Sequence, residues 1–156
     1  KEIMKVGEKC PQFTTINQDG ESFDSRQLLG HKNTIIFFYP KDFTPGCTKE
    51  VCEFRDQYDS FSKLDCEVIG ISGDSAKSHL AFYNKHNLNY HLLTDPKNRI
   101  RKLFKVPKNL FGLIPGRVSY VIDKHGTVIG IHNSLSNSSA HITFALDCLR
   151  KRQKIT

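Results

Sequence analysis

Two cysteines, Cys47 and Cys52, follow a turn-rich segment that leaves an apolar run ending at Tyr39. Two prolines and a glycine shape this segment, and the residues after it have helical spacing, so Cys47 is expected in the first turn of a helix. Unpaired N–H groups and the positive end of the helix dipole favour an anion there. We therefore expect the Cys47 thiol to ionise more readily than a free cysteine and to act as a nucleophile.

Donors that a reaction with a hydroperoxide would need lie around Cys47. The leaving oxygen develops negative charge, and both oxygens must be held in line with the sulfur. The Thr44 hydroxyl and the N–H groups of Gly46 and Cys47 can donate to these oxygens. Arg117 opens an expected strand, and a strand end can project a fixed cation into a site built at the ends of a sheet. We expect these groups to surround the thiolate.

Each neighbouring side chain also has a plain structural interpretation. The Thr44 hydroxyl could cap the helix, and Glu50 could be a first-turn acid that favours the helix dipole. Arg117 could be an ordinary surface arginine. Phe43 and the segment 111–114 could form an apolar wall that admits organic hydroperoxides, or they could simply pack against other residues.

The spacing of Cys47 and Cys52 places a condition on any disulfide between them. On a continuous helix their Cα atoms would lie roughly 8 to 9 Å apart. A disulfide tolerates at most about 7 Å between Cα atoms. If Cys52 resolves a sulfenic acid on Cys47, the first turns of the helix must unwind. This would also expose the disulfide to a thioredoxin-like reductant.

The other cysteines, Cys10, Cys66 and Cys148, have no adjacent turn or cation pattern, so we assign them no chemistry. Five cysteines without a regular framework are typical of a reducing intracellular compartment. We expect the cytoplasm, with an organelle or the nucleus as alternatives. The sequence has no Cys-x-x-Cys pair, and its seven histidines lack ligand spacing relative to the cysteines, so we expect no metal and no cofactor.

Strands and helices alternate along the chain, which predicts an α/β layered domain with a mixed central β-sheet flanked by helices. A turn signal at 17–20 predicts an N-terminal β-hairpin. The expected strands are 12–16, 21–23, 34–39, 66–72, 90–93, 117–122 and 127–133, and the expected helices are 46–64, a stretch that holds 80–86, 97–104 and 140–151. The apolar loop 107–116 is expected to fold over a surface near the site. We interpret residues 1–156 as one domain.

The formal net charge of +7 comes from 23 Lys and Arg residues against 16 Asp and Glu residues. The densest basic run is Arg150-Lys151-Arg152, with Lys154 close behind it. A solvated last helical turn, whose cations complement the helix C-terminus, is favoured over a nucleic-acid site. No apolar run approaches the roughly eighteen residues of a membrane span, so we expect no membrane association.

The frame Pro40-x3-Thr44-x2-Cys47 resembles the active-site pattern of the peroxiredoxins. The longer run 38–56 is similar to the bacterioferritin-comigratory, or Q-type, subfamily, and 116–123 resembles its arginine-bearing strand. The resemblance implies a thioredoxin-like fold with Cys47 as the peroxidatic cysteine. It also implies that Thr44 and Arg117 activate Cys47 and that Pro40 shields the site. One departure is Cys10, where the family more often has a small residue such as Ala.

The resemblance also implies an activity. Cys47 would reduce hydrogen peroxide and organic hydroperoxides to water or alcohols in antioxidant defence, and Cys52 would resolve the sulfenic acid as an intramolecular disulfide. A thioredoxin or glutaredoxin-like reductant would regenerate the dithiol, and the subfamily favours a monomer. We expect Pro40, Phe43, Gly46 and Glu50 to contact the substrate.

Two other functions are alternatives. A thiol–disulfide oxidoreductase also uses a reactive cysteine at a helix N-terminus, but its usual signature is Cys-x-x-Cys, and loss of peroxide without a disulfide substrate would exclude it. A nucleic-acid-binding module would use the basic residues 150–154. A salt-sensitive shift with duplex DNA that Cys47→Ser leaves unaffected would favour that alternative.

Overall fold

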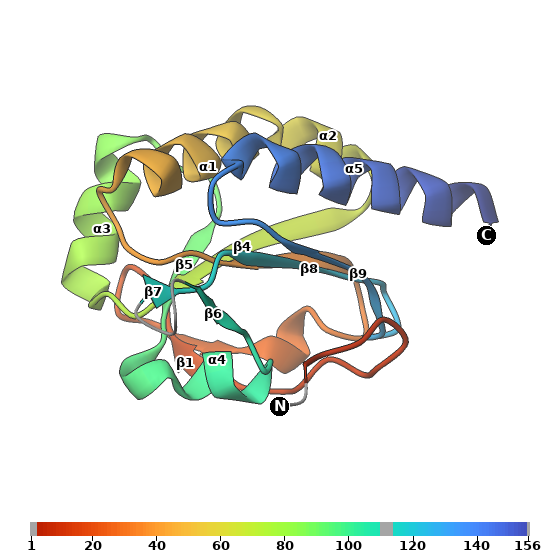
Figure 1. Cartoon of the computed structure of the whole chain (residues 1–156), viewed down its shortest axis with the longest axis horizontal. Helices are drawn as coiled ribbons and strands as arrows, with labels where there is room; N and C mark the ends of the chain where they lie inside the picture. The colour runs from red at the N-terminus through yellow and green to blue at the C-terminus, as the bar shows by residue number, and fades with distance from the viewer. Residues whose placement is uncertain (1–2, 110–113, 156) are drawn as a thin grey trace.

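The computed structural model describes residues 3–109 and 114–155. Its centre is a five-stranded sheet (Figure 1). The strands of this sheet follow the order β5-β4-β3-β8-β9. These strands are β3 Asn33–Phe38, β4 Cys66–Ser72, β5 His91–Thr94, β8 Val118–Ile122 and β9 Val128–Asn133. The pairs β3–β4 and β4–β5 are parallel, whereas β3–β8 and β8–β9 are antiparallel. The predicted mixed α/β sheet is therefore confirmed.

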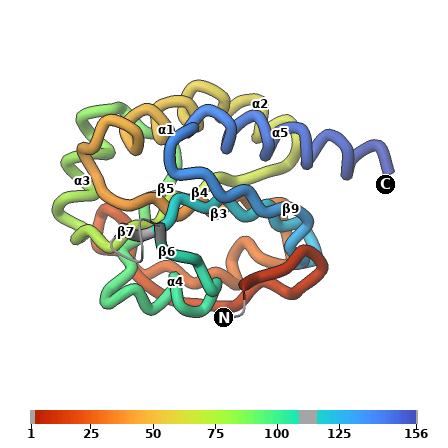
Figure 2. Tube along the Cα trace, in the orientation of Figure 1, coloured from red at the N-terminus to blue at the C-terminus, as the bar shows by residue number. Residues whose placement is uncertain are grey.

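Helices and two small sheets cover the central sheet. The helices are α1 Pro45–Asp56, α2 Tyr58–Lys63, α3 Ala76–Lys85, α4 Arg99–Leu103 and α5 Ser138–Ile155, with 3-10 turns at η1 Ser25–Gln27 and η2 Pro96–Asn98. The expected N-terminal hairpin is confirmed as β1 Thr14–Ile16 paired with β2 Ser22–Asp24. A further short pair is formed by β6 Lys108–Asn109 and β7 Ile114–Pro115. Figures 1 and 2 show α1, α2 and α5 on one face of the sheet, with α4 and the N-terminal segment on the other.

Strand β3 lies at the centre and supplies both hydrophobic cores. Ile35 and Phe37 point into the core under α1 and α5, whereas Ile36 and Phe38 point into the core on the α4 side. All four are buried, as a strand covered on both faces requires. The segments that carry Cys47 and Arg117 both adjoin β3, because α1 follows β3 in the chain and β8 pairs with β3.

Three of the predicted helices differ from those in the structure. The expected helix 46–64 is two helices that meet at Gln57, where φ is −97° and ψ is 8°. The apolar spacing runs across this break because both helices cover the same core, with the rings of Phe54 and Phe61 5.7 Å apart. The expected helix 97–104 is split by left-handed residues into η2 and α4, and the closing helix is longer than predicted. The loop 107–116 contains β6 and β7, and residues 110–113 lie outside the described residues.

Among the helices of the described residues, none is long and apolar enough to cross a membrane. The assignment of residues 1–156 to a single domain stays a prediction.

Candidate active site

Cys47 lies in the N-terminal turn of α1, where its side chain is buried. Thr44 is the N-cap residue with extended backbone angles, Pro45 is the first helical residue, and the Thr48 N–H donates to the Thr44 carbonyl at 2.8 Å. Proline suits this first position because it has no N–H to leave unpaired. Cys47 is thus the third residue of the helix, as predicted, and only 1% of it is exposed.

Arg117 joins Cys47 from the other segment, immediately before β8. Its Nη2 donates to the Cys47 Sγ at 3.2 Å, and its Nη1 donates to the Glu50 Oε1 at 2.7 Å. Its Nε donates to the Leu135 carbonyl at 3.1 Å, so the guanidinium is held on three sides. Burial lowers the pKa of Arg117, but the charges of Glu50 and Cys47 raise it above its ordinary value. The structure therefore brings together the cysteine and the arginine that the sequence predicted as partners.

Gly46 allows the arginine to approach this closely. A Cβ at this position would lie 3.1 Å from the Arg117 Nη2, which is tighter than nine in ten real Cβ contacts. The glycine is part of the helix and is exposed. Because Gly46 has no side chain, it leaves room for the Arg117 guanidinium next to Cys47.

Glu50 lies beneath Arg117 and is completely buried. It belongs to the second turn of α1, so its interpretation as a first-turn acid was wrong. Burial raises its pKa to about 8, although the charge of Arg117 opposes this shift. Within the described part of the chain, no hydrogen-bond partner reaches its Oε2, which lies 3.7 Å from the Nδ1 of His141. The carboxyl group orients Arg117 through Oε1 alone.

His141, on α5, is a buried member of this site that sequence reasoning missed. Its Nε2 lies 2.8 Å from the Ser134 carbonyl and its Nδ1 lies 2.8 Å from the Ser119 Oγ. Because a carbonyl can only accept, we assign the proton to Nε2, and the Ser119 hydroxyl donates to Nδ1. Burial lowers the pKa of His141 to about 4, so its ring is neutral near pH 7.

Thr44, Phe43 and Pro40 form the loop before α1. The Thr44 hydroxyl donates to the Lys41 carbonyl at 2.9 Å and makes no capping bond, so its interpretation as a side-chain cap was wrong. Phe43 has a left-handed backbone with φ 65° and is 48% exposed. Its ring packs on that of Phe82, with 5.0 Å between centroids. Pro40 is half-buried. The other part of the predicted apolar wall, 111–113, lies outside the described residues.

A cluster of Asp42, Asp74 and His79 supports this loop from below. One potential ligand atom of each lies within 4.8 Å of the others, close enough to hold a metal ion. However, the Asp42 Oδ2 lies 2.7 Å from the His79 Nδ1, and the Asp74 Oδ2 accepts from the Asp42 N–H at 2.8 Å. Hydroxyl groups of Ser78 and Ser72 donate to the same carboxylates. The cluster therefore satisfies its own polar groups.

Cys52 lies on α1 and is partly buried, and burial raises its pKa. Both it and Cys47 are free thiols on one unbroken helix. Burial also raises the pKa of Cys10 to about 12 and raises that of Cys66 well above its ordinary value. The Cys148 Sγ lies against the Ile129 carbonyl at 3.6 Å. The surroundings of Cys10, Cys66 and Cys148 fit thiols that remain protonated.

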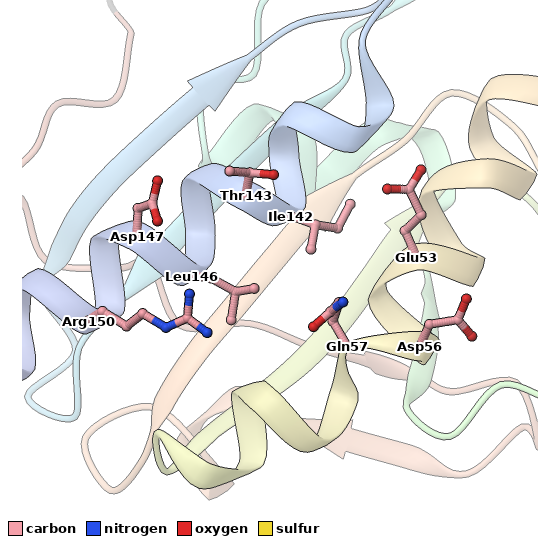
Figure 3. A pocket seen from close by; sticks show the side chains of 8 residues that line it. All are labelled: Glu53, Asp56, Gln57, Ile142, Thr143, Leu146, Asp147 and Arg150. Carbon is pink, nitrogen blue, oxygen red and sulfur yellow. The ribbon is translucent and has the colours of Figure 1, made fainter.

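A groove runs between the C-terminal part of α1 and α5 (Figure 3). Its lining residues are Glu53, Asp56, Gln57, Ile142, Thr143, Leu146, Asp147 and Arg150. Beside it, the Ser139 hydroxyl donates to the Glu53 Oε1 at 2.7 Å. The groove carries more acidic than basic groups, unlike the chain as a whole.

Comparisons with known proteins agree with this geometry. The AhpC/TSA family model matches residues 6–131. The chain is 48% identical over 147 residues to the chloroplastic peroxiredoxin Q of Gentiana triflora, which covers 94% of this chain and 67% of that protein. The crystal structure of the peroxidoxin BcpB of Mycobacterium tuberculosis has a TM-score of 0.87 and 33% identity, covering 95% of this chain and 97% of that one. A bacterioferritin comigratory protein of Xanthomonas campestris, described for alkyl peroxide reduction, has a TM-score of 0.80 and 27% identity, covering 90% and 91%.

Proposed function

Because this chain belongs to the AhpC/TSA family and is a thiol peroxidase of the peroxiredoxin type, we propose that Cys47 is its peroxidatic cysteine. The observation that carries this assignment is the Arg117 Nη2 at 3.2 Å from the Cys47 Sγ, at the start of a helix. A guanidinium and a helix N-terminus both stabilise a thiolate. The Q-type relatives and the match over most of the chain support the same role.

In the first half-reaction the Cys47 thiolate attacks the terminal oxygen of a hydroperoxide. A sulfur–oxygen bond forms and the oxygen–oxygen bond breaks, so the sulfur becomes a sulfenic acid. The leaving alkoxide or hydroxide takes up a proton from water and departs as an alcohol or as water. Arg117 and the N–H groups of Gly46 and Cys47 stabilise the developing charge, with Thr44 at the edge of the site.

The substrates of this reaction are hydrogen peroxide and organic hydroperoxides. The exposed ring of Phe43, fixed on Phe82, gives one side of the entrance an apolar surface. The Xanthomonas campestris relative is described for alkyl peroxide reduction, which supports the same substrate class here. Pro40 shields Cys47 from bulk water. Glu50 contributes by orienting Arg117 rather than by touching the peroxide.

In the second half-reaction the thiolate of Cys52 attacks the sulfenic sulfur of Cys47. A sulfur–sulfur bond forms and the sulfur–oxygen bond breaks, and the hydroxide that leaves takes up a proton from the solvent to become water. Since both cysteines lie on one helix in the reduced protein, the first turns of α1 unwind before this step. A thioredoxin or glutaredoxin-like dithiol then reduces the disulfide and is itself oxidised.

We further propose that the protein works as a monomer in a reducing intracellular compartment. Several of its relatives are chloroplastic, which makes an organelle the alternative to the cytoplasm. The site uses neither a metal nor a cofactor, since the electrons pass from thiol to peroxide directly.

Peroxide consumption with a thioredoxin system tests these roles. We expect Cys47→Ser to abolish turnover, and Cys52→Ser to consume about one equivalent of peroxide without cycling. Cys148→Ser is the matched control, because this thiol is also partly buried but lies on α5, and it should cycle like the wild type. Normal cycling by Cys52→Ser would contradict the resolving role, and activity in Cys47→Ser would contradict the whole assignment.

A further inference from the structure

A second arginine, Arg101 on α4, is buried close to the site and has no part in the mechanism above. Only 6% of it is exposed. Its Nη2 donates to the Tyr39 carbonyl at 2.7 Å, and its Nη1 donates to the Gly116 carbonyl at 2.9 Å. One guanidinium therefore joins two main-chain segments that are far apart in the sequence.

These two carbonyls lie where β3 and β8 stop pairing. The last residue pair between β3 and β8 is Phe38 with Val118. Tyr39 and Arg117, the next residues along the two segments, are not paired with each other in this ladder. On its other side, the Tyr39 N–H donates to the Ile71 carbonyl at 3.1 Å. Arg101 thus continues the connection between β3 and β8 beyond the end of their ladder.

Both segments lead directly to the reacting groups. Tyr39 comes just before the loop that carries the chain to Cys47, and Gly116 is the residue immediately before Arg117. A shift of either carbonyl would move the Cys47 sulfur and the Arg117 guanidinium relative to each other. In a reaction that depends on orientation, a displacement of about 1 Å can cost about a hundredfold in rate.

The rest of the environment fixes Arg101 firmly. Its main-chain N–H donates to the Asp95 Oδ2 at 3.0 Å, so the first turn of α4 is anchored to a buried carboxylate. Its guanidinium carbon lies 5.5 Å from the centre of the Phe38 ring. A planar fork with several donors can bind two carbonyls at once, which the single ammonium of lysine does less well.

The charge of Arg101 also has a counterpart in the site. Burial lowers its pKa to about 10, so it remains a cation near pH 7. Among the groups that oppose this shift are the Asp95 carboxylate and Cys47. Arg101 therefore also places a positive charge near Cys47, which lysine would keep and methionine would remove.

We propose that Arg101 is a positioning residue, which fixes the separation of Cys47 and Arg117 by tying together the segments that carry them. The role rests on the proposed functions of Cys47 and Arg117. Arg101 touches neither the peroxide nor the Cys47 sulfur, and it acts through the main chain.

The test compares Arg101→Lys and Arg101→Met with the wild type in a single turnover with hydrogen peroxide. We expect Arg101→Lys to lower the second-order rate constant of Cys47 oxidation about 10- to 100-fold. The pH profile of Cys47 alkylation should stay nearly unchanged in this variant, because lysine retains the charge. Arg101→Met should lower the rate constant at least as much and also move the alkylation profile to higher pH.

Arg99→Met is the matched control. Arg99 lies on the same helix, is exposed, and donates through Nη2 to the Thr14 carbonyl at 2.7 Å, away from the site. It should react like the wild type. All rate constants are measured at a temperature where circular dichroism shows each variant folded, and Arg101→Lys decides the question if Arg101→Met does not fold.

A wild-type rate constant in folded Arg101→Lys would overturn the positioning role. An equal loss in Arg99→Met would also overturn it, because the effect would then belong to α4 as a whole. The proposed function fails in a different way: Cys47→Ser would still consume peroxide, whatever the Arg101 variants do.

Discussion

The two halves of α1 are held in the fold by different kinds of contact. The half that ends at Asp56 is anchored by apolar packing, because Val51 and Phe54 are fully buried. The Phe54 ring stacks on that of Phe37, with 4.4 Å between centroids. In the half that begins at Pro45, only Cys47 and Glu50 are buried, and the helix start has no side-chain cap. It is held instead by polar bonds from Arg117 to Cys47 and Glu50.

This difference separates stability from reactivity within one helix. Apolar packing persists when a few polar contacts break, so the Cys47 half can unwind while the other half stays in the core. Such local unwinding is the condition for a disulfide between Cys47 and Cys52. Substitutions that alter one half at a time should therefore affect stability and the rate of disulfide formation separately.

Removing the anchor of the C-terminal half has the largest expected effect. Phe54→Ala should lower the free energy of unfolding by about 3–5 kcal/mol, because it leaves a cavity against Phe37. Urea denaturation measures this loss. The control is Lys49→Ala on the exposed side of the same helix, which should change stability by less than about 0.5 kcal/mol. Similar losses in the two variants would mean that the halves are not anchored differently.

The pH dependence of Cys47–Cys52 disulfide formation should reveal how Glu50, bonded to Arg117, holds the half of α1 that begins at Pro45. The pKa of Glu50 is about 8 in the wound helix and returns toward its ordinary 4.5 when the segment unwinds. The wound form binds this proton more tightly, so the stability that Glu50 contributes is complete below about pH 4.5 and is lost as the pH rises through 8. Disulfide formation after one equivalent of peroxide should therefore accelerate by at least an order of magnitude across this window.

Glu50→Gln isolates this contribution. The variant cannot ionise, so the ratio of wild-type to variant rates should climb between about pH 5 and 8. The titratable groups that interact with Glu50 include Arg117, Glu53, Tyr90 and the neutral ring of His141, and all are kept in the variant. Ionisation of Cys52, whose pKa is raised by burial, affects both proteins alike. If the ratio of wild-type to variant rates stays constant with pH, ionisation of Glu50 does not control the unwinding of the Cys47 half.

A smaller effect is expected at the hydroxyl of Tyr90, which donates to the Val51 carbonyl at 2.7 Å inside the core. Tyr90→Phe leaves that carbonyl without this donor and should cost about 1–2 kcal/mol of stability. Thermal unfolding measures the loss. The single-turnover rate of Cys47 oxidation should not change, and a slower oxidation would mean that the two halves are coupled.

The smallest effect is expected for Ser139→Ala, which removes the bond to Glu53 at the edge of the α1–α5 groove. This contact is partly exposed, so its loss should cost about 0.5–1 kcal/mol. Denaturation by urea measures it, and disulfide formation should keep its wild-type rate. Faster disulfide formation would show that α5 also restrains the Cys47 half.

The sequence was sufficient to predict those elements and site residues that a motif or a regular spacing of apolar residues marks. The alternating strands and helices predicted the mixed sheet, and the separate motif at 116–123, at the start of a strand, predicted Arg117 as the partner of Cys47. Arg101 could not be found this way, because its partners are main-chain carbonyls, which every residue has. His141 is bound to a hydroxyl and a carbonyl and leaves no spacing pattern either. The break at Gln57 was hidden because the apolar period continues through it.

Glu50 lies between the two cysteines on α1, and its bond to Arg117 affects how long a sulfenic acid on Cys47 persists. In the proposed mechanism, a sulfenic acid newly formed on Cys47 waits for Cys52 as long as the Glu50–Arg117 bond keeps the helix wound. During that wait a second peroxide molecule can convert it to a sulfinic acid, a product that thiols do not reverse. Under this mechanism, the strength of one buried hydrogen bond sets how long the oxidised enzyme is open to a second peroxide, and so how much peroxide it survives before it is inactivated.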